Sequence, residues 1–160
     1  MPLQGEYAPS SAEWVRKQVE EIESSGGTKG TSMRGMSVIV VTSMGHGSGK
    51  LRKNPVMRVE HEGLYAAVAS KGGAPEHPSW YRNLVEHPLV ELQDGPSKGD
   101  YRAREVSGEE RARWWERESR TRVRANPGPS PTTSAKAAVS TAPRSARGTA
   151  DFPGPDLCRK

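Results

Sequence analysis

The stretch "MSVIVVTSMGHGSGK", residues 36–50, joins a continuous apolar run to a glycine-rich loop that ends in Gly-Lys. Its β-branched residues predict a strand over 36–43 that is buried on both faces. After the loop, "NPVMRVEH" alternates between apolar and polar residues, and Glu62 and Gly63 turn the chain into "LYAAVASK". This pattern predicts an antiparallel hairpin with a tight turn.

Three helices and two more strands are expected around this unit. Residues 11–24 have helical periodicity, with Ser10 or Ser11 as the cap and two glycines at the end. "PSWYRNLVEH" predicts a second helix, and the capping box of "SGEERARWWER" opens a third, in which one tryptophan covers the sheet. "LVELQ" and "YRAREV" read as strands. Hairpin connections favour an α+β fold, a mostly antiparallel sheet or small barrel with flanking short helices.

The first helix presents one apolar stripe. Its members are Trp14, Val15, Val19 and Ile22. Packing across the main domain is the favoured interpretation, because four glutamates in the segment would repel an anionic membrane surface. Peripheral membrane contact stays open as an alternative.

Composition indicates a soluble chain with room for one domain. Of its 160 residues 32% are hydrophobic, and the mean hydropathy is −0.79, which leaves part of the chain outside any core. Cys158 is the sole cysteine, which excludes a disulfide framework and favours a reducing compartment. The sequence shows no signal peptide and no apolar stretch of about 20 residues, so a cytoplasmic protein without a transmembrane segment is expected.

The excess positive charge is confined to the tail. Residues 1–118 carry 16 Lys and Arg against 17 Asp and Glu, whereas residues 119–160 carry 8 against 2. With six prolines and no sustained period, residues 118–160 are expected to be a disordered, low-complexity basic tail after a domain of residues 1–117. A nucleic-acid arm is an alternative, but the tail lacks Tyr and Trp for stacking, and no nucleic-acid partner is expected.

The glycine loop does not match the catalytic motifs that it superficially resembles. In a P-loop register, Met44 would stand for the first glycine and Leu51 for the hydroxyl, and Pro55 predicts a strand where a helix is required. A nucleophile elbow around Ser48 lacks both of its glycines. The four histidines have no metal-ligand spacing, so no metal site is expected.

The loop does combine features that bind anions. Its glycines let backbone N–H groups converge, Ser48 adds a hydroxyl, and Lys50, Arg52 and Lys53 add positive charge. A second loop of this kind starts at Ser70. On spacing alone, a solvated basic loop is an equally good interpretation.

The aromatic pair at the start of the second helix is also ambiguous. Trp80 and Tyr81 either pack in the core or wall a planar ring, with Asn83 supplying polar contacts. From the residues alone, the core interpretation is favoured.

Together, these segments resemble the deazaflavin-dependent nitroreductase family of actinobacteria. The resemblance rests on "GSGKLRKNPVMRVEHEGLYAAVASKGGAPEHPSWYRNLVEHPLVELQDG", and above all on "ASKGGAPEHPSWYRNL". The flanks "MPLQGEYAPSSAEWVRKQVE" and "REVSGEERARWWER" extend it over residues 1–117. The family implies a small split β-barrel, similar to flavin reductases and FMN-binding proteins, that binds coenzyme F-420.

The resemblance also implies the position of the cofactor site. The first loop and the strand after it would hold the anionic side of the cofactor, Lys71 would add a second anionic contact, and Trp80 and Tyr81 would form the ring pocket. The corresponding positions are His46, Gly47, Ser48, Arg52, Lys53, Asn54, Pro55, Val56, Met57, Val68, Ala69, Ser70, Lys71, Ser79, Trp80, Tyr81, Arg82 and Asn83.

Two departures from the family pattern stand out. Where relatives usually carry Gly-Arg-Lys-Ser-Gly, this chain has His46 and Gly47 in place of the two cations, which weakens cofactor affinity by about 1–3 kcal/mol for each lost contact. The tail also lacks the family's tyrosine-bearing segment and final apolar strand. A reading frame that slips near Glu116–Arg120 would explain this composition.

The resemblance implies an F-420-dependent oxidoreductase. It would transfer hydride from the reduced deazaflavin to a small electron-poor acceptor, such as a quinone, an enone or a nitroaromatic, with activity impaired by the altered C-terminus. FMN is the less favoured cofactor, and a non-catalytic deazaflavin- or flavin-binding protein is the alternative function. No catalytic residue is identified, because the family's proton donor would fall in the tail.

Overall fold

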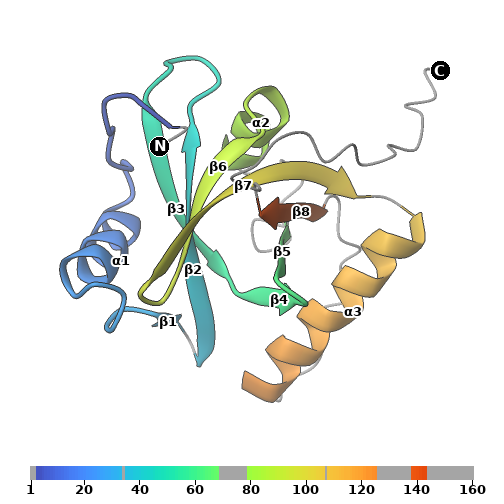
Figure 1. Cartoon of the computed structure of the whole chain (residues 1–160). Coiled ribbons are helices and arrows are strands. Elements are labelled where there is room, and N and C mark those ends of the chain that lie inside the picture. Colours follow the sequence, from blue (N-terminus) through green and yellow to red (C-terminus); the bar gives the residue numbers. More distant parts are fainter. Residues whose placement is uncertain (1–2, 34, 69–78, 107, 126–137, 144–160) are drawn as a thin grey trace.

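The helices and strands follow one another largely in the predicted order (Figure 1). The computed structural model describes residues 3–33, 35–68, 79–106, 108–125 and 138–143. The helices are α1 (Glu13–Ser24), α2 (Ser79–Glu86) and α3 (Gly108–Ala125). The strands are β1 (Ser32–Met33), β2 (Met36–Met44), β3 (Leu51–Met57), β4 (Val59–His61), β5 (Leu64–Val68), β6 (Leu89–Asp94), β7 (Ser97–Val106) and β8 (Ala138–Pro143).

The strands form one curled antiparallel sheet. Its order is β1-β2-β6-β7-β8-β5-β4, and β3 also pairs with β2. Only Arg58 separates β3 from β4, yet β3 pairs with β2 near one end of this order and β4 pairs with β5 at the other. The sheet therefore curls round until its two ends are joined by consecutive strands. This confirms the α+β, split-barrel prediction.

The β4–β5 hairpin has the predicted tight turn. Glu62 and Gly63 both have positive φ values, 53° and 80°, which is the requirement of a type I′ turn. The Glu60 carboxylate accepts a hydrogen bond from the backbone N–H of Gly63 at 2.8 Å. The turn fixes the pairing of Glu60 with Tyr65.

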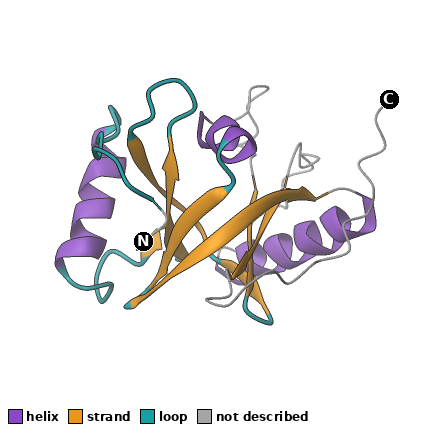
Figure 2. Cartoon of the chain, turned by 45° about the horizontal axis from the view of Figure 1, so that its top comes forward, coloured by secondary structure: helices purple, strands orange, loops and turns teal. Residues whose placement is uncertain are grey.

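Strand β2 is buried on both faces, as its apolar run predicted. One face packs against α1 and the other against the barrel interior, which α2 covers (Figure 2). The α1 side contains Val15, Val19, Ile22, Val38 and Val40. The interior contains Ile39, Val41, Leu84, Val90, Leu92 and Ala103, with Trp80 and Tyr81 packed against them.

Helix α1 corrects two details of the prediction. Trp14 is 56% exposed, because it precedes Val15 by about 100° around the helix and lies off the stripe that faces the sheet. The N-cap is Ala12, which has no side-chain cap; the Ser10 hydroxyl instead accepts the Ala12 N–H at 3.1 Å. The helix ends as predicted, and the N–H of Gly27 donates to the Ile22 carbonyl at 2.7 Å.

Helix α3 lies across the other end of the sheet (Figure 1). Trp114 is 3% exposed and packs with Val59, Ala66 and Val106, whereas Trp115 is only half-buried. The expectation that one of the two tryptophans covers the sheet is confirmed.

The C-terminal segment departs from the expected disorder in two places. Helix α3 continues to Ala125, supported by an ion pair between Arg120 and Glu116, one turn apart. Strand β8 lies between β5 and β7 and pairs with both. The edges of β5 and β7 supply hydrogen-bond partners for the backbone of this segment, although its composition does not favour a strand. The other residues of the expected tail lie outside the described ones.

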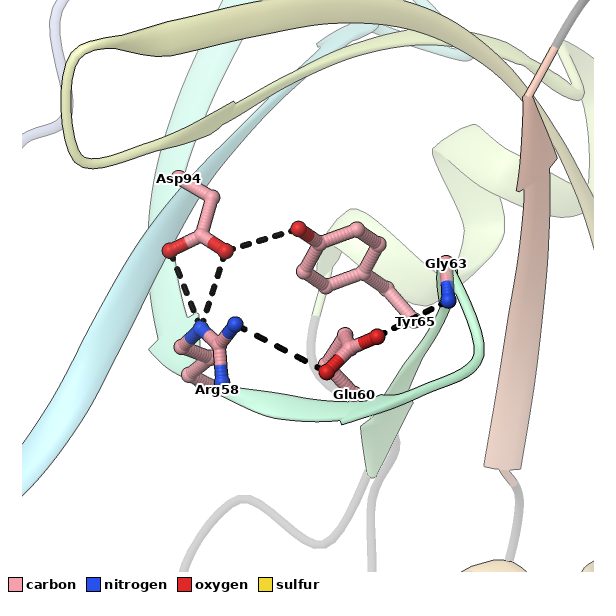
Figure 3. Close-up of polar contacts among 5 residues, drawn as sticks. All are labelled: Arg58, Glu60, Gly63, Tyr65 and Asp94. Atoms are coloured by element: carbon pink, nitrogen blue, oxygen red, sulfur yellow. Dashed lines mark hydrogen bonds and ion pairs between the residues drawn. The ribbon is translucent and has the colours of Figure 1, made fainter.

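A polar cluster links the strand junction to the sheet (Figure 3). The Arg58 Nε donates to both oxygens of Asp94 at 3.0 and 2.9 Å, and the Tyr65 hydroxyl donates to Asp94 Oδ2 at 2.7 Å. Glu60 lies 3.7 Å from the other side of the guanidinium. Burial, together with the hydrogen bond to Asp94 and its negative charge, raises the pKa of Tyr65 to about 12. The cluster therefore connects β4, β5 and β6 where the chain changes pairing partner.

Candidate functional site

The β2–β3 loop is a compact turn held by its own backbone. The Gly45 N–H donates to the Lys50 carbonyl at 2.8 Å, and the Gly49 N–H donates to the Gly45 carbonyl at 3.0 Å. A Cβ on Gly45 would lie 2.7 Å from the Ser48 hydroxyl, whereas one on Gly47 would meet nothing within 4 Å. A side chain at position 45 would therefore displace the Ser48 hydroxyl, whereas position 47 has open space. A strand follows the loop, which agrees with the exclusion of a P-loop.

A buried amide joins this loop to α2. Asn83 is 5% exposed, and its Oδ1 lies 3.0 Å from the backbone nitrogen of His46 and 2.9 Å from His46 Nδ1. The two residues are 37 positions apart in the sequence. The amide thus fixes the loop relative to the start of α2, and Figure 1 shows the loop beside that helix.

The N-terminal segment lies along the free edge of β3. The Leu51 N–H donates to the Glu6 carbonyl at 2.8 Å, and the Ala8 N–H donates to the Leu51 carbonyl at 2.9 Å. Arg52 Nη1 lies 3.2 Å from the Ala8 carbonyl and 3.4 Å from the Pro9 carbonyl. These contacts make the segment before α1 a wall beside the loop.

A cavity of about 460 Å³ lies between these elements. Its size falls in the usual range of small-molecule sites, about 300–1,000 Å³. The lining residues are Ala8, Ser10, Ser11, Gly45, His46, Gly47, Ser48, Arg52, Lys53, Asn54, Ser79 and Asn83. This set contains hydroxyls, amides, cations and a glycine loop, and it contains no carboxylate. Ser79 begins α2, and a helix start favours negative charge. The cavity is therefore suited to an anionic ligand.

The three predicted cations are not equivalent. Lys53 forms an ion pair with Glu23 of α1 and lies 5.0 Å from the centre of the Tyr7 ring. Lys50 lies 3.4 Å from Glu6. Arg52 lines the cavity with only backbone carbonyls as partners, so it has no carboxylate partner within the described part of the chain. The positive charge that a bound anion would meet is chiefly that of Arg52.

Eight of the eighteen predicted site residues line this cavity. They are His46, Gly47, Ser48, Arg52, Lys53, Asn54, Ser79 and Asn83. The structure does not bring the predicted continuation along β3 to the cavity, because Val56 packs against the interior core and Met57 against the cluster under α3. Pro55 directly precedes Val56 in β3 and is not among the lining residues either.

The predicted ring pocket is not part of the cavity either. Trp80 and Tyr81 pack against the interior core, in line with the core interpretation of this pair, and Arg82 is exposed. The Tyr81 hydroxyl donates to Glu105 at 3.0 Å; burial first, and then this hydrogen bond, raises the pKa of Tyr81. Val68 ends β5, and the predicted residues Ala69, Ser70 and Lys71 lie outside the described residues.

Four lining residues were not predicted: Ala8, Ser10, Ser11 and Gly45. The first three lie beside the cavity because a parallel bridge between Tyr7 and Leu51 holds their segment there. No local sequence pattern predicts such a contact. Gly45 had a usable signal, because it begins the same glycine loop. Among the described residues there is no group of three or more His, Cys, Asp or Glu that could hold a metal ion. None of the described helices is long and apolar enough to cross a membrane.

Comparisons with known proteins point in one direction. The family model of the F420H(2)-dependent quinone reductase matches residues 14–128. Among solved structures, an F420-H2 dependent reductase is 40% identical, with a TM-score of 0.54 over 66% of this chain and 93% of that one. A second structure, described as a domain-swapped dimer, is also 40% identical, with a TM-score of 0.57 over 83% of this chain and 100% of that one.

Two Mycobacterium tuberculosis proteins named for F420H(2)-dependent quinone reduction match shorter stretches. Rv3178 is 39% identical over 75 residues, which are 45% of this chain and 63% of that protein. Rv1261c is 48% identical over 42 residues, which are 26% of this chain and 28% of that protein. The matches thus span less than two thirds of these relatives. The family model, however, covers well over half of the chain, and the chain belongs to the F420H(2)-dependent quinone reductase family.

Proposed function

We propose that this protein binds coenzyme F-420 at the 460 Å³ cavity and transfers hydride from its reduced form to a quinone. The observation that carries the proposal is the donor set: twelve lining residues offer cations, hydroxyls and backbone N–H groups but no carboxylate. Such a set suits the anionic side of F-420, which a carboxylate would repel. Family membership, shown by the match to residues 14–128, supports F-420 over FMN as the cofactor.

The chain's own contribution is binding and orientation. Arg52 would hold the anionic side of the cofactor, with Ser48 and the loop backbone as further donors and the start of α2 adding its dipole. Bound F-420 supplies the hydride chemistry. No acid–base pair is required of the protein for that role, and its task is to hold the cofactor where an acceptor can approach.

Strand β8 supports an active protein over an impaired one. The altered composition of the tail predicted a missing final strand, but β8 pairs with β5 over four residue pairs and with β7 over six. The sheet is therefore continuous from β7 through β8 to β5. A quinone is the favoured acceptor because the family is described by that substrate, with enones and nitroaromatics as further candidates.

Titration of the purified protein with F-420 and with FMN tests cofactor binding. We expect saturable binding of F-420, followed by its fluorescence, and weaker or no binding of FMN. Addition of a quinone such as menadione to protein and reduced F-420 should then oxidise the cofactor. Binding without oxidation by any acceptor class would identify a non-catalytic deazaflavin-binding protein. Absence of F-420 binding would refute the proposal.

A matched pair of arginine variants tests the site. Arg52→Met should raise the Kd for F-420 by about 10- to 100-fold, since a charge-assisted contact contributes about 1.5–3 kcal/mol. Arg16→Met is the control, because Arg16 also donates to carbonyls of the N-terminal segment, those of Ser10 and Ser11, but does not line the cavity. Equal effects of the two substitutions would show that Arg52 acts only through the N-terminal segment.

A further inference from the structure

The hydrogen bonds of His46 determine which of its ring nitrogens carries a proton. Its backbone N–H can only donate, so the group that faces it at 3.0 Å must be the Asn83 side-chain oxygen rather than the amide NH₂. The same oxygen lies 2.9 Å from Nδ1. An amide oxygen accepts hydrogen bonds, so Nδ1 carries hydrogen in the neutral as well as the protonated imidazole.

Protonation of this histidine therefore takes place at Nε2. In the neutral ring Nε2 is an acceptor, and in the charged ring it is a donor, while the contact with Asn83 is the same in both. His46 is exposed and lines the cavity, and Nε2 has no hydrogen-bond partner within the described part of the chain. A single proton thus converts this nitrogen from a group that repels an anion into one that binds it.

Of the positively charged side chains near His46, Lys50 and Lys53 already have carboxylate partners. From β3, Arg52 and Lys53 line the same cavity, and Lys53 is paired with Glu23 of α1. From the loop, Lys50 lies 3.4 Å from Glu6 of the N-terminal segment. Helix α2 contributes Ser79 and Asn83, which do not titrate in this range. Among the described groups that line the cavity, His46 is the one whose side-chain type changes charge between pH 5 and 8.

We propose that His46 is a proton-controlled anion contact, which binds the anionic side of F-420 when protonated and loses that contact when neutral. This inference rests on the proposed function and adds to it a pH-dependent cofactor affinity. Because the anion prefers the imidazolium, binding of F-420 takes up a proton, and the affinity falls as the pH rises across the range in which histidine side chains lose their charge. A permanent cation at this position would bind without such dependence.

The test measures the Kd for F-420 from pH 5.5 to 8.5 at constant ionic strength, for the wild type, His46→Gln and His46→Arg. We expect the glutamine variant to bind about three- to tenfold more weakly than the wild type at pH 5.5 and equally at pH 8.5. His46→Arg should retain tight binding throughout. Titration of the cofactor itself affects all proteins alike and cancels in the ratio of their Kd values.

A second readout is the proton uptake itself, measured by calorimetry in buffers of different ionisation enthalpy. The wild type should take up a fraction of a proton near neutral pH, beyond the uptake of His46→Gln. His61→Gln is the matched control, since His61 is exposed at the β4–β5 turn and does not line the cavity. It should behave as the wild type.

The outcomes separate the two proposals. Saturable F-420 binding with a wild-type to glutamine ratio that is constant from pH 5.5 to 8.5 would overturn the role of His46 and leave the proposed function intact. Absence of F-420 binding by the wild type at every pH would overturn both. Thermal unfolding of each variant confirms that the comparison is made between folded proteins.

Discussion

Replacing Tyr65 with phenylalanine removes one hydroxyl from the polar cluster beside Arg58. That hydroxyl donates to Asp94 Oδ2 at 2.7 Å, while Arg58 keeps both of its bonds to the same carboxylate. Asp94 is therefore not left unpaired in the variant. The substitution removes the hydrogen bond between this neutral donor and its charged acceptor and keeps the aromatic ring.

The expected loss at neutral pH is about 1–1.5 kcal/mol. Hydrogen bonds to charged groups contribute about 1.5–3 kcal/mol, and the 22% exposure of the Asp94 side chain and 38% exposure of Arg58 place this one at or below the lower end. For a chain of 160 residues the melting temperature should fall by about 2–6 °C.

At alkaline pH the wild type loses stability at Tyr65, because burial first, and then the hydrogen bond to Asp94, raises the pKa of its hydroxyl. The pKa of Tyr65 is about 12 in the folded protein and about 10 in an unfolded chain, so between these values the folded state retains a proton that the unfolded state has lost. The contribution of this group is complete below pH 10 and is lost as the pH rises to 12, by about 2.7 kcal/mol in total. Phenylalanine does not titrate, so the two proteins should become equally stable near pH 11. At that pH the wild type has lost about 1.4 kcal/mol of the stabilisation that comes from the raised pKa of Tyr65.

Urea unfolding followed by tryptophan fluorescence, at intervals from pH 7 to 11.5, measures both effects. Tyr101→Phe is the control, because Tyr101 lies edge-on to Tyr65 at 5.7 Å but its hydroxyl donates no hydrogen bond to a residue that the structure describes. Its loss at pH 7 should be near zero. Equal losses for the two variants at pH 7, or stabilities of wild type and Tyr65→Phe that stay parallel above pH 9, would refute the reasoning.

Two further predictions concern the loop and the last strand. Gly45→Ala should raise the Kd for F-420 at least about tenfold, because the added Cβ would lie 2.7 Å from the Ser48 hydroxyl. Gly47→Ala is the control, because its added Cβ meets nothing within 4 Å and should leave the loop geometry intact. Fluorescence titration measures both Kd values, and equal values would contradict the packing argument. Deletion of residues 126–160 removes β8 and should cause aggregation or dimerisation through the free edges of β5 and β7. Deletion of residues 144–160 keeps β8 and should give the same mass by light scattering as the full chain. Identical behaviour of the two deletion variants would show that β8 does not close the sheet.

The parts of the fold that were predictable are those encoded by local pattern. The apolar run of β2, the glycine loop and the Glu62–Gly63 turn each combine periodicity with residues that permit the required backbone. Of the eight predicted cavity residues, the loop glycine Gly47, Ser48, Arg52, Lys53 and Asn83 carry local chemical signals, whereas His46, Asn54 and Ser79 were implied only by the family resemblance. The pairing of Asn83 with His46, which holds them together, had no sequence signal at a separation of 37 residues.

The missed elements depend on distant partners. Tyr7 reaches Leu51 as a single parallel bridge, so the N-terminal wall of the cavity has neither helical nor strand periodicity of its own. Strand β8 is short and only weakly apolar, and its order comes from two neighbouring strands rather than from its composition. Trp14 was assigned to the buried stripe by residue type, although its angular position places it at the margin.

The frame-slip hypothesis for Glu116–Arg120 stays a prediction that gene sequencing tests. Two observations weigh against a slip at that place: α3 continues unbroken to Ala125, and the family match extends to residue 128. An alternative frame that encodes a longer apolar final strand would support the hypothesis.

The position of β8 also has a consequence for synthesis of the chain. Tyr65 in β5 pairs with Thr141, and Tyr101 in β7 pairs with Pro143, so each neighbour is translated long before the strand that joins them. During translation the edges of β5 and β7 therefore stay open on the ribosome, and pairing across the gap has to wait until residues 138–143 have been synthesised. Slow translation of the codons between β7 and the end of β8 would prolong the interval in which a chaperone, or a neighbouring nascent chain on the same messenger, can bind those edges.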